Sequence, residues 1–404
     1  MDRDRHTDPR GGNSSQPRCK ILEAGDLKLK TKLPLVIKST MSNILDQRLE
    51  LSDQRSKRRR QRVLALSSAG GHWIQMLRLQ PAFESCDVTY ATTNTDYRSD
   101  LKDAKFRTII NANRNQKFKL LLSALSILWV ILRVWPDVII STGAAPGFFA
   151  IRIGKLFGKK TIWVDSIANA EELSMSGHRV ANYADLWLTQ WEHLAKPDGP
   201  HYFGNVLGDA SEQRSSDNEE QKSEVSSQIS ELRTPNSELR KQKPFRIFVT
   251  VGSDVPFDRM VKIIDQWAAK NPEHVVFAQI GRTSWKPESL EYCQILTPIE
   301  YTKKVNESDV IVAHAGMGSI LTALKHQKTI LTMPRLGHLG ETRNEHQTAT
   351  ANRLLDLGKI NVAFNEDELT TQLQNAAQLQ TNSLSSRFAE RELTKRISEF
   401  AHCN

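Results

Sequence analysis

The sequence has few cysteines, and their spacing argues against two kinds of small fold. Only four occur in 404 residues (Cys19, Cys86, Cys293 and Cys403), and no two of them form a CxxC pair. A disulfide scaffold needs a dense cysteine pattern, and a zinc ribbon needs paired CxxC motifs. We therefore expect neither, and four scattered cysteines suit a reducing, cytosolic compartment.

Long apolar runs and common cofactor motifs are also missing. No 18 consecutive apolar residues occur, which argues against a polytopic membrane protein. Neither GxGxxG nor GxxxxGK[ST] is present, which weakens a dinucleotide or P-loop interpretation. There is no HExxH motif, and the eight-residue spacing of His338 and His346 is unlike that of a zinc site, so we expect no metal.

Positive charge is concentrated at one end of the chain. The net charge is +9, and residues 1–62 hold sixteen Lys or Arg and eight Asp or Glu, so the remainder is close to neutral. This argues against nucleic-acid binding by the folded part. We expect residues 1–62 to be a disordered basic extension without a signal peptide. Its run Lys57–Arg60 is either a solvated charge cluster or a contact to anionic lipid headgroups.

From residue 63 onward, short apolar runs alternate with helical patterns, which predicts parallel sheets covered on both faces. The predicted strands are 63–68, 87–93, 106–110, 137–142, 160–165, 185–190, 246–252, 274–281, 293–296, 309–316 and 328–334, with helices at 342–357 and 384–401. The polar stretch 209–243 interrupts this pattern. We predict two Rossmann-like α/β domains, 63–208 and 245–404, joined by a flexible linker at 209–244 and facing each other across a cleft.

The segment 117–135 contains thirteen uncharged residues, Leu120–Leu132, flanked by basic residues and tryptophans. That run is too short to cross a bilayer comfortably. Two interpretations remain open. The segment is either a core helix of the first domain, or a helix in the membrane interface with its basic and Trp residues at headgroup depth.

Two loops of the first half have the composition of a ligand site. Gly70 and Gly71 follow the first predicted strand, where glycine lets backbone amides approach a ligand. His72 comes next, and a histidine near its free pKa can accept a proton from a hydroxyl; alternatively, it caps or packs the helix. The loop 141–147 is rich in small residues, which leave room for a ligand or for a neighbouring helix.

Two loops of the second half suggest a nucleotide-sugar site. Gly252 and Ser253 form a turn before a helix start, which suits a phosphate contact. Residues 313–319 offer backbone amides and the Ser319 hydroxyl to phosphate oxygens. A polar cluster at 341–347 follows, and its carboxylates and amides suit ribose or sugar hydroxyls.

Six stretches, in the same order, resemble a known family. They are SSAGGHWIQMLRL, DVIISTGAAPGFFA, ADLWLTQWEHL with YFGNVLG, VTVGSDVPFDRM, SDVIVAHAGMGSIL and PRLGHLGETRNEHQTATA. The first half resembles the membrane-associated subunit, and the second half the catalytic subunit, of a two-part glycosyltransferase. In eukaryotes that pair adds the second N-acetylglucosamine of the dolichol-linked oligosaccharide, and similar bacterial pairs build capsule and exopolysaccharide units.

The resemblance implies a GT-B glycosyltransferase fold, similar to the enzyme that glycosylates the peptidoglycan lipid intermediate, with a family 28 domain in the second half. It implies an inverting, metal-independent transfer from a UDP-sugar to an acceptor on polyprenyl pyrophosphate, without a further cofactor. It also implies a peripheral protein at the cytoplasmic face of the membrane, whose two halves pair within one chain.

The candidate site residues follow from the loops and the resemblance together. His72 falls where the family places its candidate base. The acceptor-side candidates are Gly70, Gly71, Thr142, Gly143 and Pro146. The donor-binding candidates are Gly252, Ser253, His314, Ala315, Gly316, Met317, Gly318, Ser319, Glu345, His346 and Gln347. The chain departs from the family at 165–171 and at Ser253-Asp254, which affects the acceptor side most.

Two other functions fit parts of this pattern. One is an enzyme of the same fold that resembles a UDP-N-acetylglucosamine epimerase, which would need additional carboxylates in the cleft. The other is a non-catalytic, nucleotide-sugar-binding subunit that recruits a separate transferase to the membrane. Replacing His72 by Ala distinguishes them, because an enzyme would lose turnover whereas a recruiting subunit would not.

Overall fold

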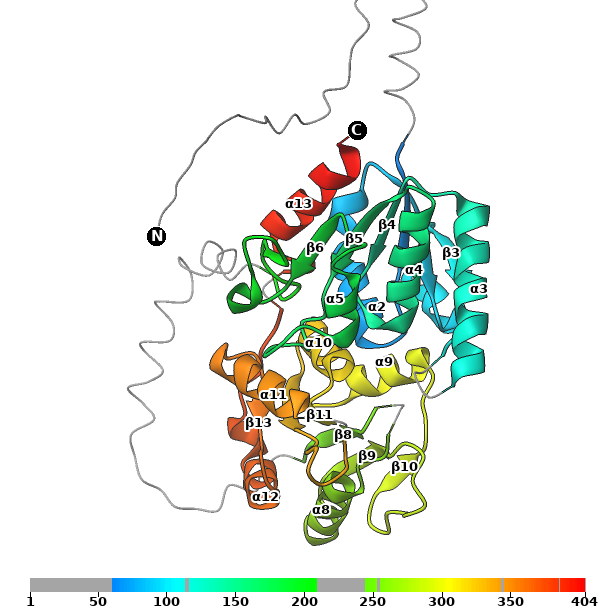
Figure 1. Ribbon diagram of the computed structural model, residues 1–404. Helices are drawn as coiled ribbons and strands as arrows, with labels where there is room; N and C mark the ends of the chain where they lie inside the picture. The colour runs from blue at the N-terminus through cyan, green and yellow to red at the C-terminus, as the bar shows by residue number, and fades with distance from the viewer. Residues whose placement is uncertain are drawn as a thin grey trace, which may run out of the picture. The chain divides into compact units, whose positions relative to one another are not determined.

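The structure is a computed structural model that describes residues 60–112, 116–208, 244–252, 255–342, 345–384 and 386–403 (Figure 1). The basic extension up to residue 59, the linker from 209 to 243, and Ser253 lie outside the described residues. The predicted division into two domains at 208 and 245 stays a prediction. Two parallel sheets, each with its own set of helices, make up the described part.

The first sheet has seven parallel strands in the order β3-β2-β1-β4-β5-β6-β7. They are β1 (Arg62–Leu66), β2 (Asp87–Thr92), β3 (Lys105–Thr108), β4 (Val138–Ser141), β5 (Lys160–Val164), β6 (Leu186–Thr189) and β7 (His201–Tyr202). The helices of this part are α2 (Gly71–Arg78), η1 (Gln80–Phe83), η2 (Thr95–Asp100), α3 (Lys117–Val134), α4 (Ala144–Leu156), α5 (Met175–Val180) and η3 (Glu192–Leu194). Val63 of β1 is paired with Val88 and Val138 on its two sides and is fully buried. Such apolar strands form because helices cover both faces of the sheet.

The second sheet has six parallel strands in the order β10-β9-β8-β11-β12-β13. They are β8 (Arg246–Thr250), β9 (Val275–Gln279), β10 (Glu291–Cys293), β11 (Val310–His314), β12 (Thr329–Met333) and β13 (Asn361–Val362). The helices that follow β8 along the chain are α8 (Asp258–Lys270), α9 (Pro298–Glu307), α10 (Met317–Lys325), α11 (His346–Asp356), α12 (Glu366–Gln374), η4 (Ala376–Gln378) and α13 (Arg391–His402).

Both sheets have the same topology. Counted in chain order within each sheet, the first six strands lie in the order 3-2-1-4-5-6, which is that of the Rossmann fold. The predicted fold class, two Rossmann-like α/β sheets in one chain, is therefore confirmed. In each sheet the strand order reverses next to the first strand, between β1 and β4 and between β8 and β11, which is where such sheets bind ligands.

Two predicted helices and one predicted strand differ from the structure. The helix expected at 342–357 begins at His346, and the one expected at 384–401 begins at Arg391. Residues 386–390 do not form the expected helix, because their backbone bonds to distant segments: the amide of Ala389 donates to the carbonyl of Arg78 and that of Glu390 to the carbonyl of Asn205. The strand expected at 293–296 lies earlier, at Glu291–Cys293.

One buried apolar cluster joins helices from the first part of the chain, up to residue 208, to helices from the second part, from residue 244 onward. It includes Trp73 and Met76 of α2, Ile320 of α10 and Leu393 of α13. The last helix, α13, lies beside the first sheet (Figure 1) and packs against η1. The Nε2 atom of His402 near its end is 2.8 Å from the Ser85 hydroxyl. The second part of the chain thus ends on the first.

Helix α3 has one buried and one exposed apolar face. Ser123, Ile127, Val130 and Ile131 are buried. The opposite face exposes five apolar side chains, which we call the α3 face: Phe118, Leu121, Leu125, Trp129 and Leu132. The helix therefore contributes to the core with one side only. No helix in the described ranges has the length and apolarity that a membrane crossing requires.

Candidate active site

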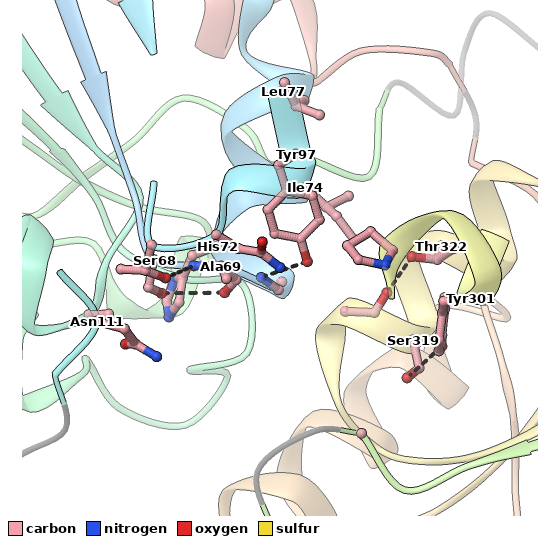
Figure 2. Close-up of a pocket in the computed structure, with 18 of the residues that line it drawn as sticks. Ser68, Ala69, His72, Ile74, Leu77, Tyr97, Asn111, Tyr301, Ser319 and Thr322 are labelled. Atoms are coloured by element: carbon pink, nitrogen blue, oxygen red, sulfur yellow. Dashed lines mark hydrogen bonds between the residues drawn. The ribbon is translucent and has the colours of Figure 1, made fainter. Parts of the chain in front are cut away.

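A cavity of about 2210 Å³ is lined by loops of both sheets (Figure 2). Nine of the predicted site residues line it: Gly70, Gly71, His72, Pro146, Gly252, His314, Gly318, Ser319 and Gln347. Seven others do not form its wall: Thr142, Gly143, Ala315, Gly316, Met317, Glu345 and His346. Seven of these nine, all but Pro146 and Gln347, lie at the carboxyl ends of β1, β8 and β11, in the loops there or in the first turn of the helix that follows. These loops meet because they leave the carboxyl ends of strands next to the two points where the strand order reverses.

The ring of His72 is fixed by Thr142. Nδ1 of His72 lies 2.8 Å from the carbonyl oxygen of Thr142, and the Thr142 hydroxyl donates to the carbonyl of His72, also at 2.8 Å. Because a carbonyl only accepts, Nδ1 carries the hydrogen, and in the neutral ring Nε2 is the basic nitrogen. Burial lowers the pKa of His72, and the Thr142 bond and the charge of Asp165 offset this in part. The neutral ring is thereby favoured at pH 7.

The segment 165–171, where the sequence differs from the family that it resembles, is hydrogen-bonded to α2, the helix that carries His72. The carboxylate of Asp165 accepts hydrogen bonds from the Ser174 hydroxyl and the Ser174 amide at 2.6 and 2.8 Å. The fully buried Gln75 of α2 donates to the Ser166 hydroxyl and accepts from the amide of Ile167. These residues therefore connect α2 to the loop after β5.

The start of α2 touches the start of α10. A Cβ atom on Gly71 would lie 3.0 Å from the backbone nitrogen of Gly318, and one on Gly318 would lie 3.3 Å from the nitrogen of Gly71. Only glycine allows two backbones to approach this closely without a shift. Two helix N-termini, each with unpaired amides and a positive partial charge, thus meet at the cavity.

Ser319 follows Gly318 on α10 and also lines the cavity. The hydroxyl of Tyr301 is 3.1 Å from that of Ser319 and donates to it (Figure 2). The hydrogen of the Ser319 hydroxyl is then available to a ligand oxygen. Sequence reasoning did not select Tyr301, because it lies on α9, away from the glycine-rich motifs.

His314 is a neutral histidine in the wall. Burial, followed by the nearby charge of Arg335, lowers the pKa of His314 to about 3. Its Nδ1 has no hydrogen-bond partner among the described residues. The sequence predicts a donor contact here, and the side chain lines the cavity in a form that carries no charge at neutral pH.

Arg335 is a cavity residue that sequence reasoning passed over. It is 5% exposed, and its guanidinium donates to the carbonyls of Val251, at 2.7 Å, and of Val255. Its backbone amide donates to the side chain of Gln347 at 3.1 Å. Arg335 therefore connects the turn after β8 to α11 and brings a buried positive charge to the cavity. The only signal in the sequence is an arginine after Met333-Pro334.

The loop between β12 and α11 is held by carboxylates. Arg259 forms a bidentate ion pair with Glu341, with nitrogen–oxygen distances of 2.7 and 2.9 Å. The backbone amides of Gly337 and His338 lower the pKa of Glu345 by bonding to its carboxylate. The Nε2 atom of His346 lies 3.8 Å from the carboxylate oxygen Oε1 of Glu172, in the first part of the chain. Glu345 and His346 thus contact other protein groups, whereas Gln347 faces the cavity.

The described residues contain no group of three or more His, Cys, Asp or Glu side chains that could hold a metal ion. The expectation of a metal-free site stays a prediction.

Two protein families match the chain. Residues 246–401 match the glycosyltransferase family 28 C-terminal domain, and residues 104–206 match the Alg14-like oligosaccharide biosynthesis proteins. Over 71 residues the chain is 32% identical to the UDP-N-acetylglucosamine transferase subunit ALG13 of Debaryomyces hansenii; this covers 18% of the chain and 32% of that relative. The chain thus spans about a third of the length of this curated relative. These matches confirm the resemblance inferred from the six stretches.

Two solved structures are similar to the chain in fold. MurG of Acinetobacter baumannii has a TM-score of 0.48 at 15% identity, over 84% of this chain and 99% of that one. The UDP-GlcNAc 2-epimerase of Methanocaldococcus jannaschii has a TM-score of 0.49 at 11% identity, over 84% of this chain and 98% of that one.

Proposed function

We propose that this chain, which joins an Alg14-like segment and a glycosyltransferase family 28 C-terminal domain in one polypeptide, transfers a sugar from a UDP-sugar. The acceptor is a hydroxyl of a saccharide carried on polyprenyl pyrophosphate. One observation carries the proposal: His72, whose Nδ1 bonds to the Thr142 carbonyl and so leaves Nε2 as the basic nitrogen, lines the same cavity as Gly318 and Ser319 of the predicted donor turn.

The reaction requires a base and a displaced leaving group. Nε2 of His72 takes the proton of the acceptor hydroxyl, and the acceptor oxygen attacks the anomeric carbon of the donor. The bond between that carbon and the β-phosphate oxygen breaks, UDP leaves with the electron pair, and the anomeric configuration inverts. Nδ1–H stays bonded to the Thr142 carbonyl, which keeps the ring oriented while it becomes an imidazolium.

The departing UDP carries negative charge that the site has to stabilise. The N-termini of α2 and α10 supply unpaired amides, and the Ser319 hydroxyl has a hydrogen to donate. The buried guanidinium of Arg335 adds a full positive charge beside the turn after β8. Preorganised donors of this kind can take the place of a divalent metal, which supports the metal-independent assignment.

The α3 face supports peripheral association with a membrane. Phe118 is 72% exposed and Trp129 60% exposed, and apolar side chains in such a stripe are costly to leave in water. Basic residues surround this face: Lys117, Lys119 and Arg133 are exposed, and the ammonium of Lys159 is 4.0 Å from the ring centroid of Trp135. Apolar residues with flanking Lys, Arg and Trp are typical of helices that lie in the lipid interface.

Sedimentation of the full chain with vesicles tests the membrane contact. We expect binding to vesicles that contain phosphatidylglycerol, and at least about 10-fold weaker binding after Leu125→Glu with Trp129→Glu. Leu357→Glu is the control, because Leu357 is also exposed but follows α11. Equal binding of the α3 variant and the control would contradict the contact.

The transfer itself is tested by incubating the full chain with single UDP-sugars and polyprenyl-pyrophosphate-linked saccharides in the presence of EDTA. We expect one UDP-sugar to release UDP and extend the lipid-linked acceptor. Binding of a UDP-sugar without turnover, unchanged by His72→Ala, would favour the recruiting subunit instead.

A further inference from the structure

Arg78, the last residue of α2, is buried among backbone carbonyls. It is 5% exposed, and its guanidinium donates to the carbonyl oxygens of Ser386 at 3.0 Å, Arg387 at 3.1 Å and Phe388 at 2.7 Å, and also to that of Val206. Burial lowers the pKa of Arg78 to about 10, and no carboxylate of the described residues offsets this. The group is still charged at pH 7, and the carbonyl dipoles replace a counterion.

These carbonyls belong to two segments that connect the two parts of the chain. Val206 follows β7 and precedes the linker that begins at residue 209. Residues 386–388 lead from the second sheet's helices to α13, which packs on η1. The segments also bond to each other, since the amide of Glu390 donates to the carbonyl of Asn205. Arg78 is therefore hydrogen-bonded to both connecting segments, at Val206 and at residues 386–388.

The close approach of the two segments depends on a glycine. Gly208 has a φ of +90°, and a Cβ atom there would lie 2.7 Å from the Ser386 hydroxyl and 2.9 Å from the Ser386 nitrogen. A side chain at 208 would therefore push the segment 386–388 away from Arg78. This gives a second way to disturb the contact without changing the arginine.

The other end of α2 carries His72. His72 and Arg78 are six residues apart on this helix, so their Cα atoms are separated by about 9 Å along its axis. At that end Gly71 contacts Gly318. A short, packed helix moves as a unit. The position of His72 is therefore set by the contacts at both ends of α2: those of Arg78 with the two connecting segments, and that of Gly71 with the predicted donor turn.

We propose that Arg78 is a positioning residue for the transfer: by anchoring α2 to both connecting segments, it keeps Nε2 of His72 in register with the donor turn of α10. The inference rests on the proposed function. Arginine suits this place because its planar fork reaches several carbonyls at once, whereas a lysine ammonium is a single point charge.

The first test compares Arg78→Lys with wild type in the full chain. We expect kcat to fall about 10- to 100-fold, with the KM for the UDP-sugar within about 2-fold, because a small misplacement of the base affects the chemical step. Gly208→Ala should lower kcat in the same way. The controls are Arg62→Lys, in an arginine that pairs with Asp137, and Gly358→Ala, where a Cβ atom meets nothing within 4 Å. A fall in kcat for the controls as large as for the variants would overturn the inference.

The second test asks whether Arg78 acts through His72. In the His72→Ala background, Arg78→Lys should change the residual rate by less than about 2-fold, because the base that it positions is gone. An unchanged 10-fold loss in that background would mean that Arg78 affects the reaction in another way, and would overturn the inference.

A third readout does not depend on activity. Amide hydrogen exchange of residues 71–78 and 386–390 should be faster in Arg78→Lys and in Gly208→Ala than in wild type, with β8 unchanged. Equal exchange in all three chains would overturn the anchoring. If the wild-type chain transfers no sugar but the exchange differs as expected, the proposed function fails and the anchoring by Arg78 stands.

Discussion

A Cβ atom on Gly143 would lie 2.5 Å from Cε1 of His72 and 2.7 Å from its Nδ1. The imidazole therefore lies directly against the backbone of the loop after β4, whose preceding residue, Thr142, accepts the Nδ1 hydrogen. Gly143 also has a φ of +131°, which other residues rarely adopt. The place of the candidate base depends on the absence of a side chain here.

Gly143→Ala should therefore displace His72. We expect kcat to fall by at least about 10-fold, because the Nδ1 bond to Thr142 cannot form once the ring has moved. UDP affinity should stay within about 2-fold. Gly158→Ala is the matched control: Gly158 also has a positive φ, but a Cβ atom there meets nothing within 4 Å. Similar kinetics for the two variants would argue against the role of Gly143.

The decrease of kcat/KM at low pH should reflect the protonation of His72. Burial lowers the pKa of this histidine below 6.5, so the ring is neutral at pH 7 and becomes protonated only at lower pH. A protonated ring cannot accept the acceptor's proton. We expect log(kcat/KM) to be level near pH 7 and to fall with a slope of one below an apparent pKa under 6.5. His72→Gln should remove this step and lower kcat by roughly 100-fold or more. A step that persists in His72→Gln belongs to another group.

The position of His72 at the ligand-binding edge of the sheet could be predicted from the sequence, whereas the contacts that orient its ring could not. An apolar strand followed by Gly70, Gly71 and His72 is a local pattern, and the Rossmann strand order then brings that loop to the ligand edge. The Thr142 carbonyl and the close contact with Gly143 depend on a segment 70 residues away. Such long-range contacts leave no periodic signal in the chain.

Arg78 and Arg335 could not be recognised from the sequence for the same physical reason. Arg78 and Arg335 both bind backbone carbonyls, and any residue type can supply a carbonyl, so no partner motif marks them. His346 lies within a recognised motif, yet it is directed at Glu172 of the other part of the chain. A motif therefore gives the region of a site, and tertiary packing decides which side chain faces the cavity.

The free energy of unfolding should decrease as the pH is lowered, and His314 should account for part of this decrease. Its folded pKa of about 3 lies below the unfolded value of about 6.5, so the unfolded chain binds a proton more readily in between. The contribution of His314 to the free energy of unfolding is therefore fully present above pH 6.5 and is lost progressively as the pH falls from 6.5 toward 3. Urea unfolding from pH 7.5 to 5 should show a shallower pH dependence for His314→Asn than for wild type. His178→Asn, at an exposed histidine of α5, is the control. An unchanged slope in His314→Asn would contradict this assignment.

The two parts of the chain should remain together without a covalent connection at the linker. A protease site placed within 209–243 and then cleaved leaves the Arg78 bonds to 386–388 intact, as well as the packing of α13 on η1. We expect the two fragments to elute together on gel filtration. A chain lacking residues 391–404 should separate after cleavage. Separation of the fragments with α13 present would mean that these contacts are too weak to hold them.

The most direct test of the account is sugar transfer measured side by side for wild type and His72→Ala. Each chain is given a panel of UDP-sugars with a polyprenyl-pyrophosphate-linked acceptor in EDTA, and both UDP release and the extended lipid product are quantified. The account predicts product from one donor with wild type, a loss of roughly 100-fold or more in His72→Ala, and equal UDP binding by both chains. Equal turnover by the two chains, or a donor that binds wild type and is never transferred, would contradict it.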